Sequence, residues 1–307
     1  MAQHRLDPTP DTVTDVFSRD LPPVLTIDPG DTVVVRSLDA GGHLERQLTP
    51  GVDRSLMFSA RRGHVLTGPI AVRGAEPGMV LAVRLSQLRP DDWGFTNAAA
   101  RDTPLNRRLG LADASPRWLL WDLDVDKLTG TNDLGHTVDL APFLGVIGVP
   151  PDEPGEHSTR PPRPACGGNI DCRDLVAGST LYLPVTVSGA LLCIGDGHGA
   201  QGDGEVSGTA IECGMTSEIV VDLVTDPPVP TVHAVTPTSR ITFGFSEDLN
   251  EAMAAALDAM LGWMQSLFTL DKAAALALAS PTVDLRVTQV ANDVWGVHAV
   301  LPHDAIR

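Results

Sequence analysis

Short apolar segments separated by turn residues dominate the first two-thirds of the chain. Hydrophobic and polar positions alternate over a few residues at a time between frequent glycines and prolines, which is the period of a strand with one buried face. Two of these strands follow Pro-Gly turns, at Pro29-Gly30 and at Pro77-Gly78. The pattern predicts two strands within 24–38, one on each side of the first turn, and another strand directly after the second turn. Further strands are predicted at 118–125, 181–187, 190–194, 219–223 and 240–245.

The helical period is clear only near the C-terminus. Apolar residues recur there every three or four positions, at Leu249, Met253, Leu257, Met260, Leu261, Met264 and Phe268. This stripe predicts an amphipathic helix with Ser246 as its N-cap, and we interpret the stripe as core packing rather than a cofactor site. A second helix is predicted at 271–279, followed by strands at 283–290 and 294–300.

These elements predict an α+β fold that is predominantly β. We expect sandwich-like or barrel-like β domains with a C-terminal helical pair packed on the sheet, and the 43% hydrophobic content is enough for a sizeable core. The proline-rich segment 149–164 suggests a boundary between a β-rich domain, residues 1–150, and an α+β domain, residues 151–307. The alternative is that the two parts form one intertwined unit.

The charge balance excludes several classes of partner. A formal net charge of −17 repels nucleic acid and anionic membrane surfaces. The first residues show no basic region followed by an apolar run, and charged residues interrupt the apolar segment 252–279, so we expect a cytoplasmic protein without membrane contact. No CxxC pair occurs among Cys166, Cys172, Cys193 and Cys213, which we expect to be reduced and structural.

The densest group of polar side chains lies in the glycine-rich segment 195–205. In an extended backbone Asp196 and His198 share one face, and Gln201, Asp203 and Glu205 share a face beyond Gly199. Such a set is suited to a metal or a polar substrate. The alternative interpretation is a solvated hairpin in which the aspartates only cap their own turns.

Two further segments carry candidate chemistry. Asn169 and Asp171 follow a glycine pair with one residue between them, so both face one way in an extended chain, although Asp171 can equally cap a turn. His64 precedes a Gly-Pro turn, where a lone histidine is usually a hydrogen-bonded structural residue. His298, in a predicted valine-rich strand, is interpreted as structural.

Three long motifs in order give the chain a resemblance to a known family. The segments 63–78, 167–185 and 195–205 resemble the acetamidase/formamidase family, and the closing segments 284–290 and 296–302 fit as well. Met79 and Gly199 depart from the family pattern. The motifs of α/β-hydrolases, P-loop enzymes, zincins and dinucleotide enzymes are missing.

This resemblance implies a homodimer or higher homo-oligomer that hydrolyses a short linear amide such as formamide or acetamide. An imidazole and carboxylates with one open position suit a catalytic divalent metal, for which zinc is the first choice and calcium or magnesium the alternative. We assign Asp171, Asp196 and His198 as its ligands. The catalytic candidates are Glu205, His64 and Asp203, where His64 is either a stabiliser of the oxyanion or a fourth ligand, and the candidates for orienting the amide are Asn169 and Gln201. If the metal is only structural, Glu205 or Cys172 could carry the chemistry unaided.

Two competing functions stay open from the sequence. The first is hydrolysis of a larger or cyclic amide, with Trp93 and Phe95 of the segment 91–115 forming a pocket wall. The second is a non-catalytic β-sandwich that binds a metal or a small polar ligand, and it predicts thermal stabilisation by the ligand without turnover.

Overall fold

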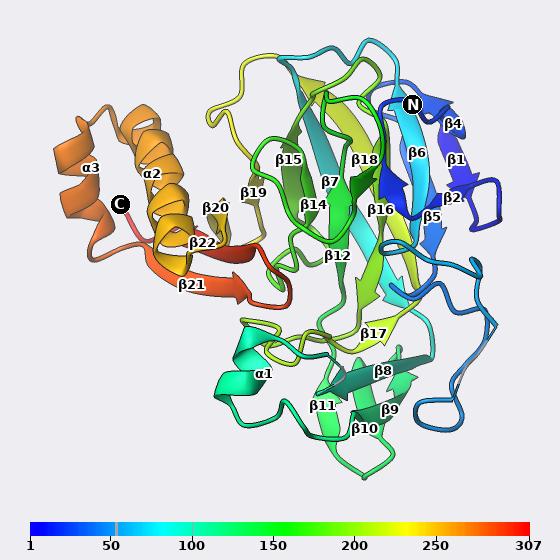
Figure 1. Ribbon diagram of the computed structural model, residues 1–307. Helices are drawn as coiled ribbons and strands as arrows, with labels where there is room; N and C mark the ends of the chain where they lie inside the picture. Colours follow the sequence, from blue (N-terminus) through cyan, green and yellow to red (C-terminus); the bar gives the residue numbers. More distant parts are fainter. Residues whose placement is uncertain (53–54, 100) are drawn as a thin grey trace.

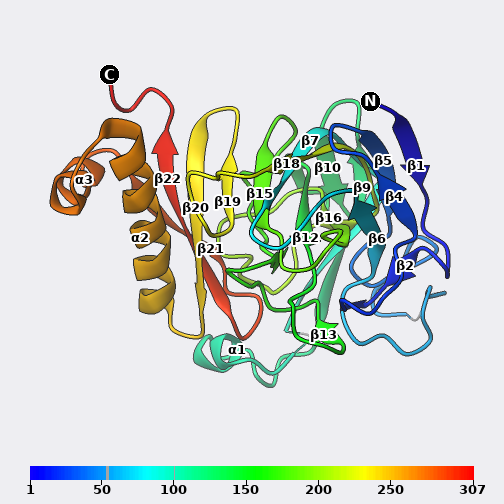
Figure 2. The same ribbon diagram turned by 90° about the horizontal axis from the view of Figure 1, so that it is seen from above.

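The computed structural model describes residues 1–52, 55–99 and 101–307. Strands form most of its regular secondary structure, and a pair of helices stands at one end (Figure 1). The predicted α+β, predominantly β fold is therefore confirmed. The sheets pack on one another as open sheets, as the view from above also shows (Figure 2).

The first sheet has the strand order β1-β5-β18-β7-β15-β19-β20-β22-β21. Its strands are β1 (Gln3–Leu6), β5 (Thr32–Ser37), β18 (Met215–Val224), β7 (Val80–Pro90), β15 (Thr180–Pro184), β19 (His233–Val235), β20 (Ser239–Ser246), β22 (Trp295–Pro302) and β21 (Asp284–Gln289). Neighbours in this order come from both sides of residue 150, so the two predicted domains share this sheet. The boundary at residue 150 stays a prediction.

The second sheet has the order β11-β10-β9-β8-β17-β16-β12-β14, and β6 also pairs with β16. Its strands are β11 (Thr137–Asp139), β10 (Thr129–Asn132), β9 (Arg117–Asp124), β8 (Trp93–Ala98), β17 (Glu212–Cys213), β16 (Leu192–His198), β12 (Phe143–Gly148), β14 (Gly167–Asn169) and β6 (Leu66–Val72), on which β2 (Val13–Thr14) and β4 (Leu25–Ile27) pair. In the proline-rich segment β13 (His157–Ser158) pairs with β3 (Val16–Phe17).

One hydrophobic core joins the two sheets. Leu81 and Leu85 of β7 belong to the same buried cluster as Ile147 of β12 and Ile194 of β16. Burial of each such side chain contributes roughly 1.5–3 kcal/mol to folding. The core therefore fixes the second sheet, which carries the polar motifs, against the first.

The helices are α1 (Pro104–Arg108), α2 (Leu249–Phe268) and α3 (Lys272–Ala279). Helix α2 packs on β20 and β22, and α3 packs on α2. Gly244 of β20 permits this close contact, because a Cβ atom there would lie 1.9 Å from the Ala252 carbonyl oxygen.

Ser246, the predicted N-cap of α2, lies two residues before the residue that caps the helix. Asp248 caps the helix by accepting a hydrogen bond from the Asn250 amide, and Ser246 ends β20. The β20 ladder extends as far as Ser246, so the turn into the helix comes after it. In the part of the chain that the structure describes, no helix is both long and apolar enough to cross a membrane.

Candidate active site

The polar motifs meet at the β17-β16-β12-β14 end of the second sheet. Strand β12 pairs with β14 on one side and β16 on the other, and β16 in turn pairs with β17. Asp171 follows β14, Asp196 and His198 lie on β16, and Glu212 lies opposite His198 on β17. Glu205 comes from the loop that connects β16 to β17. Four separate places in the chain thus contribute to one cluster.

Three carboxylates of this cluster have unusual backbone conformations. The φ angles of Asp171, Asp196 and Glu205 are 52°, 58° and 45°. Left-handed conformations are uncommon outside glycine, and they concentrate at functional sites because each costs on the order of 1–3 kcal/mol. They also break the simple alternation of an extended chain, so the side chains converge by local turns rather than by sharing a flat strand face.

Gly145 of β12 makes room for the cluster. A Cβ atom at this position would lie 2.6 Å from Asp171 Oδ1, 2.6 Å from Asp196 Oδ2 and 3.0 Å from His198 Cε1. The carbonyl oxygen of Gly145 accepts the backbone N–H groups of Ile170 at 2.9 Å and Asp171 at 3.2 Å. The same glycine therefore holds the turn that carries Asp171 and leaves space for its carboxylate.

The side chains form two overlapping sets of possible metal ligands. One ligand atom from each of Asp171, Asp196 and His198 lies within 4.8 Å of the others, and the same holds for His198, Glu205 and Glu212. His198 Nε2 lies 3.4 Å from Asp196 Oδ1 and 3.5 Å from Glu212 Oε1. All five side chains are buried.

Many of these buried polar atoms have no hydrogen-bond partner among the described residues. They are both carboxylate oxygens of Asp171, both ring nitrogens of His198, Oε2 of Glu205 and Oε2 of Glu212. Buried carboxylates are normally paired or bound to a cation, since an uncompensated buried charge is costly. Four carboxyl groups around one imidazole therefore fit a divalent cation.

The electrostatics of the cluster agree with this need for a cation. Burial, and then the charge of Asp196, raise the pKa of Asp171 well above its usual value. Burial and the Asp171 charge do the same to the pKa of Glu205, and burial raises that of Glu212. Burial opposes ionisation of Asp196, but the charges of His64 and His198 outweigh it and lower its pKa.

His198 is the positive partner of these acids. Burial lowers the pKa of His198, but Glu212 and Asp196 outweigh burial and hold this pKa well above its usual value. The ring also makes an edge-on contact with Phe143, with 4.9 Å between centroids. The imidazole orientation is thus fixed by packing.

Of the other predicted residues, His64 and Asn169 share a cavity with the cluster, and Gln201 supports one of its turns. His64 and Asn169 line the same cavity as Asp196, and both Nδ1 of His64 and Oδ1 of Asn169 are buried without a partner among the described residues. The His64 backbone N–H donates to Thr159 Oγ1 at 2.7 Å. Gln201 Nε2 donates to the carbonyl of Asp171 at 2.8 Å, so this side chain supports the Asp171 turn.

Asp203 points to a different partner. Arg286 donates to both carboxylate oxygens of Asp203, at 2.7 and 2.9 Å, and it also binds Asp174. The expected shared face of Gln201, Asp203 and Glu205 does not form, because the segment after β16 folds into turns instead of an extended strand. The structure thus brings Glu205, but not the Asp203 carboxylate, to the cluster.

The sequence analysis missed Glu212 and Gly145. Glu212 stands between Ile211 and Cys213 in a short buried strand, and an acidic residue in such apolar company is a usable signal of a buried site. Gly145 has no comparable signal, because its role depends on side chains that arrive from other strands. Cys172 is fully buried, and burial raises the pKa of its thiol, which disfavours the thiolate.

A cavity of about 360 Å³ opens onto the cluster. Asp196, Glu205 and Glu212 line it together with Phe95 and Trp118. Among the residues described, Phe95 fulfils the predicted position in the wall, whereas Trp93 does not line the cavity.

Comparisons with known proteins agree with the motifs. The sequence pattern of the Acetamidase/Formamidase family matches residues 3–156 and 154–304. A formamidase from Methylophilus methylotrophus is 27% identical over 288 residues, 72% of this chain and 68% of its own length. An acetamidase from Mycolicibacterium smegmatis is 28% identical over 221 residues, 52% of this chain and 53% of its own. The crystal structure of an acetamidase from Bacillus halodurans superposes with a TM-score of 0.86 at 27% identity, covering 97% of each chain.

Proposed function

The chain belongs to the acetamidase/formamidase family of amide-hydrolysing enzymes, and we propose that it cleaves the C–N bond of a small amide with the help of a divalent metal. Amide and water give a carboxylate and ammonium. The observation that carries the metal assignment is the group of buried, unpartnered carboxylate and imidazole atoms around Gly145. The names of the formamidase and acetamidase relatives support a formamide-like or acetamide-like substrate.

Asp171, Asp196 and His198 are the proposed ligands. An imidazole with carboxylates suits zinc, whereas the oxygen-rich set formed with Glu205 and Glu212 suits calcium or magnesium as well. A divalent ion supplies two things when bound: it acidifies a water molecule and polarises the amide carbonyl.

Glu205 is the proposed proton carrier. Burial and the Asp171 charge raise its pKa, so its carboxylate is a stronger proton acceptor than that of an exposed glutamate. It takes a proton from the attacking water and passes it to the leaving nitrogen. His64 and Asn169 are proposed to bind the amide oxygen and nitrogen, because each lines the cavity and has a buried polar atom without a partner among the described residues.

Metal analysis and ammonia release test this proposal together. Purified protein is assayed by elemental analysis and with formamide, acetamide and propionamide. We expect His198→Ala to lose metal and activity together, while His136→Ala, a change of an exposed histidine, keeps both. Full metal content in the His198 variant contradicts its role as a ligand.

The same assay separates the enzyme from a binding protein. A non-catalytic protein shows a rise in melting temperature with metal or amide but releases no ammonia. Cytoplasmic location and homo-oligomeric assembly stay predictions, and light scattering of the purified protein tests the second.

A further inference from the structure

The cavity carries opposite charges at its floor and at its entrance. The floor is formed by the buried acids Asp196 and Glu205, with Glu212 beside them. Three solvent-accessible arginines, Arg61, Arg101 and Arg160, line the same cavity. In a protein with a net charge of −17, three cations at one opening form a local site for an anion.

The guanidinium groups of these arginines are available to a ligand. Within the described ranges, none of the three forms an ion pair with a carboxylate, whereas the neighbouring Arg62 pairs with Asp15 at 2.8 Å. Arg61 donates to the carbonyl of Ala40 at 2.5 Å, and Arg101 donates to that of Gly208 at 2.9 Å. A guanidinium has five N–H donors, so these single bonds orient the groups and leave donors for a ligand.

Two of the arginines also act on each other. Partial burial, and then the charge of Arg160, lower the pKa of Arg61, while Asp39, Asp196 and Glu212 offset part of this effect. Two guanidinium groups that repel each other at an opening are stabilised by an anion bound between them.

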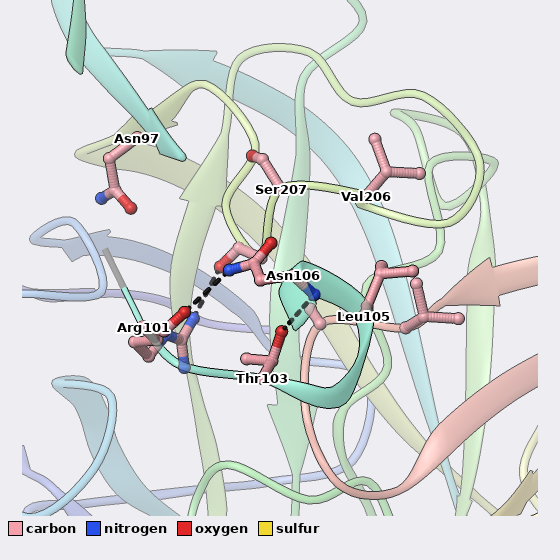
Figure 3. A pocket seen from close by; sticks show the side chains of 10 residues that line it. Asn97, Arg101, Thr103, Leu105, Asn106, Val206 and Ser207 are labelled. Atoms are coloured by element: carbon pink, nitrogen blue, oxygen red, sulfur yellow. Dashed lines mark hydrogen bonds between the residues drawn. The ribbon is translucent and has the colours of Figure 1, made fainter. Parts of the chain in front are cut away.

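Arg101 is held in place by the short helix beside it. Asn106 of α1 is buried and donates from Nδ2 to the Arg101 carbonyl at 2.7 Å, and the Asn106 amide donates to Thr103 Oγ1 at 3.1 Å (Figure 3). Asn97 and Ser207 line a small pocket together with Arg101 and Asn106, which the close-up shows (Figure 3). Helix α1 therefore holds the backbone of Arg101, and the Gly208 carbonyl orients its guanidinium.

The cavity is larger than the smallest amides require. Its volume of about 360 Å³ lies in the ~300–1,000 Å³ range of ordinary ligand pockets, and acetamide has very few non-hydrogen atoms. Phe95 and Trp118, with 5.4 Å between their ring centroids, add apolar surface to the cavity wall. This leaves room for a short carbon chain.

We propose that the preferred substrate is an amide with a carboxylate at its other end, such as the half-amide of a short dicarboxylic acid. The amide lies at the acidic floor and the carboxylate binds Arg61 and Arg160, with Arg101 as the third cation. This inference rests on the proposed function. The bond that breaks is the same C–N bond, and water supplies the oxygen of the new carboxylate.

Ammonia release from two molecules of equal size tests the proposal. Succinamate carries the anionic end, and succinamide replaces it with a second, neutral amide. We expect kcat/KM of the metal-loaded enzyme to favour succinamate at least ten-fold, after allowance for the two amides of succinamide. In Arg61→Gln and Arg160→Gln this ratio should fall at least ten-fold, and Arg61→Lys should restore part of it.

Arg108→Gln is the matched control, since Arg108 ends α1, is exposed and does not line the cavity. It should keep the ratio. A wild-type ratio at or below one, or an unchanged ratio in both arginine variants, overturns the proposal. If no amide is hydrolysed, the proposed function fails, and calorimetric binding of succinate then decides the anion site: at least ten-fold weaker binding by Arg61→Gln supports it, and no binding to the wild type overturns it.

Discussion

Gly145 directly faces the carboxylate of Asp171, and a Cβ atom added to Gly145 would lie 2.6 Å from Asp171 Oδ1. This distance is shorter than any stable carbon–oxygen contact. A flexible side chain elsewhere could move aside, but Asp171 is buried and its turn is bound to the Gly145 carbonyl. The arrangement of the site therefore requires a residue without a Cβ atom at position 145.

We expect Gly145→Ala to lower metal affinity by roughly 10–100-fold, the usual effect of disturbing the shell around ligands, and to lower activity with it. Overpacking should also reduce the free energy of unfolding by about 1–3 kcal/mol. Metal titration and chemical denaturation measure the two effects. Gly262→Ala is the control, because Gly262 lies exposed on α2 with open space around it, and it should stabilise the helix by up to about 1 kcal/mol. Undiminished metal affinity in Gly145→Ala would show that the ligands lie elsewhere.

Much of the fold could be predicted because its signals are local. The strands at β9, β20, β21 and β22 match their alternating segments to within two residues, and Asp271 caps α3 where a helix was predicted. The sheet order could not be predicted, because the pairing of strands distant in sequence is set by the shared core. Ser246 was misplaced as a cap since the end of the β20 ladder depends on its partner β22.

The candidate site shows the same limit. The motifs supply Asp171, Asp196, His198 and Glu205, which the structure brings together, but the assumption of an extended backbone placed Asp203 beside them. Positive φ angles and turns decide where these side chains point, and alternation cannot predict them. Glu212 reaches the cluster through the pairing of β16 with β17, which no local pattern encodes.

The hydrogen bonds from Arg286 to the Asp203 carboxylate indicate that Asp203 has a structural role. If Asp203 only ties the loop to β21, Asp203→Asn should lower kcat less than ten-fold and keep the metal. Because both side chains are partly exposed, the lost ion pair should cost about 1 kcal/mol or less. Arg286→Gln should resemble it in kinetics. A loss of 10²–10⁴-fold in kcat for Asp203→Asn would instead identify an acid–base group there.

Buried His233 predicts a dependence of stability on pH. Its ring stacks on Tyr182 at 4.6 Å between centroids and contacts Trp263 edge-on, and burial lowers its pKa from 6.5 to about 4. The unfolded chain therefore takes up a proton first as pH falls. The contribution to stability is complete above pH 6.5 and is lost between 6.5 and about 4, by on the order of 3 kcal/mol at 1.36 kcal/mol per pKa unit.

His233→Phe keeps an aromatic ring and removes the titration. Its free energy of unfolding, measured by denaturant at several pH values, should fall less steeply than that of the wild type over this interval. The change leaves the Thr231 carbonyl without its 2.8 Å hydrogen bond, so the absolute stability should also shift. Only the difference in slope tests the pKa, and parallel curves for the two proteins would contradict it.

The most direct test of the chemistry is Glu205→Gln. Glutamine keeps the size of the side chain but cannot accept the proton from water, so kcat should fall by roughly 10²–10⁴-fold with metal and fold retained. Stopped assays of ammonia release and elemental analysis measure both quantities. Glu218→Gln, the same change on β18 away from the cavity, controls for the loss of a carboxylate.

Glu212→Gln distinguishes the two glutamates of the cluster. Oε1 of Glu212 accepts the amide of Ala210 at 2.9 Å, and His198 Nε2 lies 3.5 Å from the same atom, so this carboxylate is held against the imidazole. Neutralising it removes a charge that raises the His198 pKa, which favours the neutral, metal-binding imidazole. We therefore expect Glu212→Gln to alter the pH dependence of metal binding more than kcat. If Glu205→Gln loses the metal while Glu212→Gln loses the rate, the roles are exchanged: Glu205 is a ligand, and Glu212 carries the proton.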